Sequence, residues 1–101
     1  MKLVLVTVVE QYENDVLQLF KKAKIKNFSE SSIEGYKQAE SLHLASNWFS
    51  AGKNGVKSSM FFSFTTVEKI DVLFELIKEF NKNLESQNPI KAVVVPIEKF
   101  I

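Results

Sequence analysis

The sequence predicts an α+β fold, in which a four-stranded antiparallel sheet carries two helices on one of its faces. Two runs are apolar and rich in β-branched or aromatic residues, which is typical of buried strands. Two other segments repeat apolar residues at helical spacing. The order strand, helix, strand occurs twice within 101 residues, and two such βαβ halves pack as one sandwich with the first and third strands in the centre.

The first half begins with residues 3–9, which are almost wholly apolar and predict a buried central strand. A helix is expected from Glu13 or Asn14, with an apolar face of Val16, Leu19, Phe20 and Ala23. Lysines in its last turn complement the helix dipole. Residues 27–36 are mostly polar and alternate, which favours an edge strand that breaks at Gly35.

The second half opens with a very apolar strand at residues 60–64. Thr65 and Glu68 fit a capping box at the start of the second helix. That helix has an apolar face of Ile70, Leu73, Phe74, Ile77, Phe80 and Leu84. The valine-rich strand at residues 91–98 contains Pro96, which has no N–H for a ladder hydrogen bond and therefore places this strand at an edge.

This arrangement is the ferredoxin-like βαββαβ sandwich, predicted here as one domain over residues 1–101 with an inserted loop at about 37–55. Alternation along its strands puts apolar side chains on both sheet faces, although two helices cover only one. An uncovered apolar face of this extent exceeds what monomers usually expose. The sequence therefore favours an oligomer. The alternative is that residues 37–55 fold back over that face; they could form a short helical stripe or a loop.

Composition excludes several classes of function. The net charge is +1, so no basic field indicates nucleic acid or a membrane surface. The chain has no Cys, which excludes disulfides and thiolate metal sites, and all its basic residues other than the single histidine are lysines. No signal peptide or membrane-spanning run is recognisable. We expect a soluble, cytoplasmic protein that does not insert into membranes.

The sequence shows no catalytic set. One histidine, His43, and two aspartates, Asp15 and Asp71, provide no Ser/His/Asp arrangement, so we expect no enzyme. Glu40 precedes His43 by three residues, but two ligands make a weak metal site and no metal is expected. The carboxylates of Glu30, Glu34 and Glu40 could be paired, although a solvated edge strand and loop explain them equally well.

Two segments resemble known families. Residues 33–38, Ile-Glu-Gly-Tyr-Lys-Gln, resemble the end of the second strand in P-II nitrogen regulatory proteins, where a Gly-aromatic pair opens a long loop. Residues 91–98, Lys-Ala-Val-Val-Val-Pro-Ile-Glu, resemble the last strand of that family. The related CutA divalent-cation-tolerance proteins have a Trp-Trp-x-Gly strand that is similar to residues 48–52. Both families imply homotrimers in which the open sheet faces pack together.

The P-II resemblance implies a regulatory protein that senses a small ligand, such as an adenine nucleotide, between subunits. It implies a ligand-binding set of Gly35, Tyr36, Lys37, Gln38, Lys57 and Lys91. Residues 37–55 would contact a target, such as a membrane transporter, with His43, Trp48 and Phe49 as the contact residues.

The chain also departs from the P-II pattern. The family's Gly-Asp-Gly turn before the lysine is Asn88-Pro89-Ile90 here, and the family's arginines after the last strand have no counterpart. These differences remove the backbone phosphate cradle and favour a P-II-like sensor of another small ligand, or a protein that binds none. The alternative function is a CutA-like trimer that handles divalent metals or is purely structural, without nucleotide binding.

Overall fold

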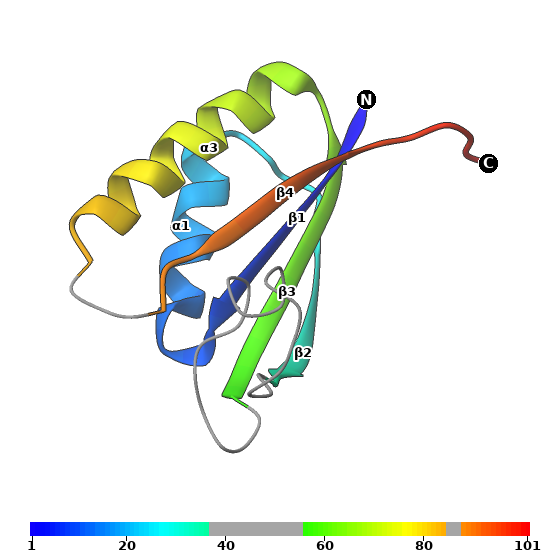
Figure 1. Ribbon diagram of the computed structural model, residues 1–101. Coiled ribbons are helices and arrows are strands. Elements are labelled where there is room, and N and C mark those ends of the chain that lie inside the picture. The colour runs from blue at the N-terminus through cyan, green and yellow to red at the C-terminus, as the bar shows by residue number, and fades with distance from the viewer. Residues whose placement is uncertain (37–55, 85–87) are drawn as a thin grey trace.

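The computed structural model describes residues 1–36, 56–84 and 88–101. Its sheet has the strand order β2-β3-β1-β4, and every neighbouring pair is antiparallel (Figure 1). The predicted α+β sandwich is confirmed, with β1 and β3 in the centre and β2 and β4 at the edges. The elements are β1 (Lys2–Val9), the 3-10 turn η1 (Glu10–Tyr12), α1 (Glu13–Lys22), β2 (Ser29–Gly35), β3 (Val56–Thr65), α3 (Val67–Lys82) and β4 (Lys91–Pro96).

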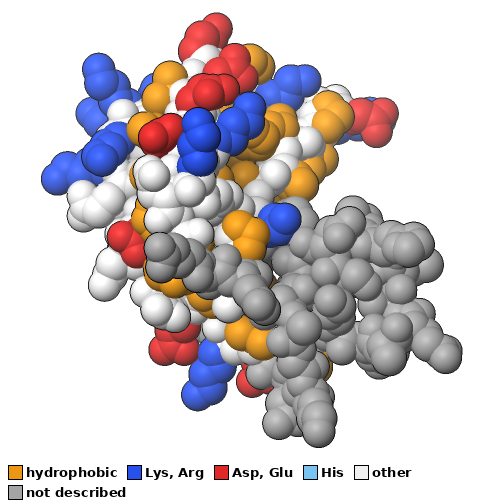
Figure 2. Space-filling model, turned by 60° about the vertical axis from the view of Figure 1, so that its left-hand side comes forward, with side chains coloured by type: hydrophobic (Ala, Val, Ile, Leu, Met, Phe, Trp, Pro, Cys, Tyr) orange, Lys and Arg blue, Asp and Glu red, His pale blue; other side chains and the backbone are white. Residues whose placement is uncertain are grey.

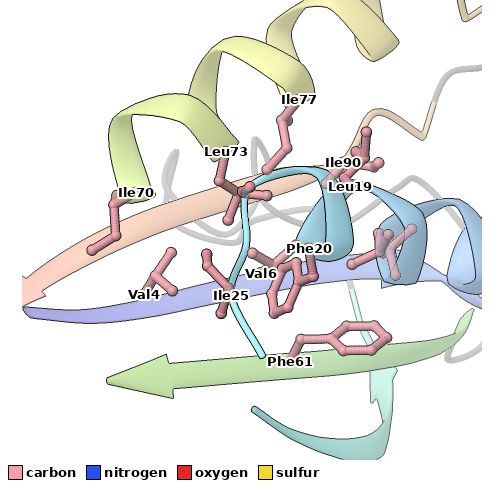
Figure 3. Packing of buried hydrophobic residues seen from close by; sticks show 13 residues of the cluster. Val4, Val6, Leu19, Phe20, Ile25, Phe61, Ile70, Leu73, Ile77 and Ile90 are labelled. Atoms are coloured by element: carbon pink, nitrogen blue, oxygen red, sulfur yellow. The ribbon is translucent and has the colours of Figure 1, made fainter. Parts of the chain in front are cut away.

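The core lies between the sheet and the two helices (Figure 3). Strand β1 contributes Val4, Val6 and Val8, and Phe61 of β3 is fully buried beside them. The helices contribute apolar residues three or four positions apart, which share one side of a helix. These are Val16, Leu19 and Phe20 from α1, and Ile70, Leu73 and Ile77 from α3.

Helix α1 ends in a turn that the sequence did not indicate. Lys24 has a positive φ of 61°. The Lys24 N–H donates to the carbonyl of Lys21, and the Ile25 N–H donates to the carbonyl of Phe20, both at 3.0 Å. This pair of bonds is the Schellman motif, in which glycine usually takes the left-handed position.

Helix α3 begins one residue later than the predicted capping box requires. Thr65 still belongs to β3, where it pairs with Lys2, so it cannot cap the helix. Thr66 takes the extended N-cap conformation, and its Oγ1 accepts a hydrogen bond of 3.4 Å from the Lys69 N–H. The prediction that Thr65 caps this helix is therefore wrong, because β3 continues through that residue. Strand β3 also begins four residues before the predicted position, because Val56 pairs with Gly35.

The face of the sheet away from the helices is largely apolar over β1, β4 and the second half of β3, as the alternation predicts. We call it the open face, and its residues on β1, on β3 from Met60 onward and on β4 are Leu3, Leu5, Thr7, Val9, Met60, Phe62, Phe64, Lys91, Val93 and Val95. The start of β3 adds Val56 and Ser58, and β2 adds Ser29, Ser31, Ile33 and Gly35. The register confirms that they share a side, since Leu5 pairs with both Phe62 and Val93. Phe64 is 54% exposed and Val95 is 37% exposed, so part of this surface is open in the single chain.

Charges of both signs are interspersed on the molecular face that Figure 2 shows. No helix among the described residues is long and apolar enough to cross a membrane.

Candidate functional site

One end of the sheet gathers residues from all four strands. Strand β2 ends there at Gly35, and β1 ends there at Val9. The antiparallel β3 and β4 begin at the same end (Figure 1), where they place Lys57 and Lys91. The predicted ligand residues that the structure describes therefore come together at one end of the fold.

The two lysines face opposite sides of the sheet. Lys57 pairs with Glu34 and shares the side of Phe61, which faces the helices. Lys91 pairs with Thr7 and lies on the open face. Within one chain they do not share a face, so a common site for both would have to include more than one copy. Their role in ligand binding stays a prediction.

The remaining predicted site residues are Lys37, Gln38, His43, Trp48 and Phe49. They lie outside the described part of the chain.

On the helix side, Lys57 borders a hollow of about 450 Å³ that is rich in carboxylates. The hollow lies where β2, β3 and the start of α1 meet. It is lined by Glu10, Glu13, Glu30, Ser32, Ile33, Glu34, Lys57, Ser58 and Ser59. The sequence allowed for paired carboxylates among Glu30, Glu34 and Glu40, of which Glu40 lies outside the described residues. Within the described residues, Glu30 interacts with Glu13 at the start of α1.

Glu13 and Glu30 interact as a pair of carboxyl groups. A hydrogen bond with Glu13 is the main cause that raises the pKa of Glu30, and partial loss of hydration and repulsion between the two groups add to it. The Ser59 hydroxyl donates to Glu13 Oε2 at 3.1 Å, which holds Glu13 toward the strands. Sequence reasoning missed this pair because the two residues are 17 positions apart and meet only through the register of β2.

Tyr36 follows directly after β2 and is fixed to the same end of the sheet. Its hydroxyl donates to Glu34 Oε2 at 2.7 Å. This hydrogen bond raises the pKa of Tyr36, because the phenolate would lose the bond and be repelled by the carboxylate. The side chain is otherwise largely exposed, so its ring is available to a ligand or a second chain.

On the open face, Lys91 is held by the residue before it. Ile90 is only 2% exposed and belongs to the core with Leu19 and Ile77 (Figure 3). The Asn81 side chain bonds both backbone groups of Ile90. Its Oδ1 accepts from the Ile90 N–H, and its Nδ2 donates to the Ile90 carbonyl, each at 2.9 Å.

Within residues 1–36, 56–84 and 88–101, no three or more His, Cys, Asp or Glu side chains form a group suited to a metal ion. The groups of the candidate site that the structure describes are therefore the lysines Lys57 and Lys91, the carboxylate pair of Glu13 and Glu30, and the phenol of Tyr36.

Comparison with known proteins supports the fold. No protein-family model matches this chain, and no curated protein matches its sequence. Among solved structures, the chain is similar to CPII, a nitrogen regulatory PII-like protein from Thiomonas intermedia K12, bound to ADP, AMP and bicarbonate. The TM-score is 0.63, and the match covers 99% of this chain and 94% of CPII at 11% identity. The fold expected from the resemblance is confirmed, and identity this low carries the fold alone.

Proposed function

We propose that this protein is a non-enzymatic PII-like regulator that binds a small ligand, in the first place an adenine nucleotide, between the subunits of a homotrimer. The observation that carries the proposal is the extent of the fold match. Nearly the whole chain follows the fold of a PII-like protein whose structure holds ADP and AMP. Gly35, from one of the two segments that resemble the P-II family, and Lys91, from the other, lie at the same end of the sheet.

The ligand site that we propose depends on Lys91 of one copy. Its position on the open face directs it toward the surface that assembly would cover. An ammonium group near such an interface is poorly hydrated, which strengthens its attraction for a phosphate or carboxylate. The chain has no arginine, so its lysines are its available permanent cations. Lys57 and Tyr36 of a neighbouring copy would complete the site from the other face.

Assembly is proposed from the open face. Both helices pack on the opposite side of the sheet, while Phe64, Val93 and Val95 remain partly exposed. Burial of such side chains contributes about 25 cal/mol per Å², so contact between copies would stabilise the trimer. Residues 37–55 follow Tyr36 directly, and we propose that they meet the target protein.

The ligand proposal is tested by calorimetry and thermal shifts with ADP, AMP, ATP and bicarbonate. We expect ADP or AMP to bind, and Lys91→Ala to weaken binding about tenfold, the usual effect of removing a charged hydrogen-bond partner. Lys82→Ala, an exposed lysine at the end of α3, is the matched control and should bind like the wild type. Absence of binding by all four compounds at millimolar concentration would contradict the proposal. A divalent-metal titration then tests the CutA-like alternative.

A further inference from the structure

We infer that Asn81 is a positioning residue that fixes the direction of Lys91 through the backbone of Ile90. This inference rests on the proposed function, because it gives Lys91 the ligand contact. It adds a residue that lies ten positions away on helix α3 and that touches no part of the open face itself.

The geometry allows Ile90 very little freedom. Its side chain is in the core, so the residue cannot rotate about the strand axis without exposing an apolar group. Both of its backbone polar groups are bound by one amide, with two bonds of 2.9 Å. Asn81 thereby continues the hydrogen bonding of β4 by one residue and links it to α3.

Fixing Ile90 determines the direction of the next residue, Lys91. Successive side chains of a strand point to opposite faces, so an Ile90 that is fixed toward the helices sends Lys91 to the open face. Without the Asn81 bonds, Lys91 would be the first residue of an edge strand held only on the β1 side. Such strand ends fray readily, and its ammonium group would then sample several directions.

The same bonds indicate how an anion would be held. The Ile90 N–H already donates to Asn81, so it is not available to cradle a phosphate as the backbone of a glycine-rich turn does. The charge of Lys91 must then provide the attraction at this position. Asn81 forms the hydrogen bonds with the backbone of Ile90, and Lys91 remains to bind the ligand.

The test is a double-mutant cycle with ADP and AMP as ligands, measured by calorimetry. Asn81→Leu has a similar volume but makes neither bond, and we expect it to weaken binding about tenfold in the wild-type background. In a Lys91→Ala background it should have no further effect, because its action passes through Lys91. Asn83→Leu is the control, since the exposed Asn83 amide donates to the Glu79 carbonyl of α3 and makes no other side-chain hydrogen bond within the described residues. Equal losses in both backgrounds would overturn the inference.

A second measurement separates this inference from the proposed function and does not depend on a nucleotide. In NMR spectra, Asn81→Leu should accelerate exchange of the Ile90 amide hydrogen and move the Lys91 side-chain resonances, while Asn83→Leu moves neither. If Asn81→Leu does not fold, Asn81→Asp is used, because it keeps the acceptor for the Ile90 N–H and loses the donor to its carbonyl. Unchanged Lys91 resonances in the folded variant would overturn the inference. If the wild type binds no nucleotide but the NMR changes are seen, the result counts only against the proposed function.

Discussion

At the scale of single residues, Glu13 and Glu30 are notable because their two carboxyl groups interact with each other. A shared hydrogen bond requires one of them to keep its proton, and this is why the pKa of Glu30 is raised. Both groups lie at the rim of the hollow and are partly hydrated, so the effect on stability is modest. The pair links Glu30 of the edge strand β2 to Glu13 at the start of α1.

The expected pH dependence follows from the sign of this shift. The pKa of Glu30 in the folded protein lies above the ordinary value of 4.5. Its contribution to stability is therefore fully present below pH 4.5 and is lost as pH rises through the folded pKa. Glu30→Gln cannot ionise, so its free energy of unfolding should exceed that of the wild type increasingly as pH rises from 4 to 7.

Urea unfolding at several pH values measures this difference. Glu79→Gln, which removes an exposed carboxylate from α3, serves as the control and should not reproduce the trend. A difference between Glu30→Gln and wild type that stays constant over this pH range would show that the pair does not share a proton.

At the scale of elements, the end of helix α1 carries a conformational cost. Lys24 adopts the left-handed conformation with φ of 61°, which costs a residue with a Cβ about 1–2 kcal/mol. Glycine avoids this cost but loses about 0.5–1 kcal/mol of backbone entropy on folding. We therefore expect Lys24→Gly to raise the free energy of unfolding by up to about 1 kcal/mol.

The matched substitution is Lys22→Gly, at the last residue of α1. There the backbone is helical, so glycine should lower the free energy of unfolding by about 1 kcal/mol. Urea denaturation of both variants gives the comparison. If both substitutions lowered stability equally, the left-handed conformation of Lys24 would carry no cost that glycine relieves.

The sequence predicted the elements whose position depends on local pattern. The apolar residues of β1 and β3 place these strands in the centre, and Pro96 places β4 at an edge, so the strand order followed from the local patterns and the repeated strand-helix-strand order. Features that depend on register were missed. Thr66 rather than Thr65 caps α3 because β3 pairs one residue further, and the Glu13–Glu30 contact exists only once β2 lies beside the start of α1.

The candidate site was predictable to the same degree. Gly35, Lys57 and Lys91 were expected near one another, and the strand directions do place them at one end. The two lysines point to opposite faces because of the register in which their strands pair, and the sequence does not give that register. The bonds between Asn81 and Ile90 join residues of two different elements, and an asparagine near the end of a helix has no pattern that distinguishes such a contact.

At the scale of the whole molecule, the open face decides whether the chain acts alone. Leu3 pairs with both Phe64 and Val95, so the exposed side chains of three adjacent strands form one apolar surface. Stable interfaces bury about 800 Å² on each partner. A lysine in the middle of such an interface would have to lose hydration without gaining a partner, which is strongly unfavourable.

We therefore expect the wild type to sediment at three times its chain mass of 11.5 kDa, and Val95→Lys to sediment as a single chain. Val72→Lys is the matched control, because Val72 is 48% exposed on α3, on the other side of the sheet, and it should leave the assembly intact. Sedimentation equilibrium over a range of protein concentrations distinguishes these outcomes. A wild type of one chain mass would favour the alternative in which residues 37–55 cover the open face. A Val95→Lys variant that keeps the wild-type mass would show that the copies meet through another surface, since the substituted side chain would then remain in water.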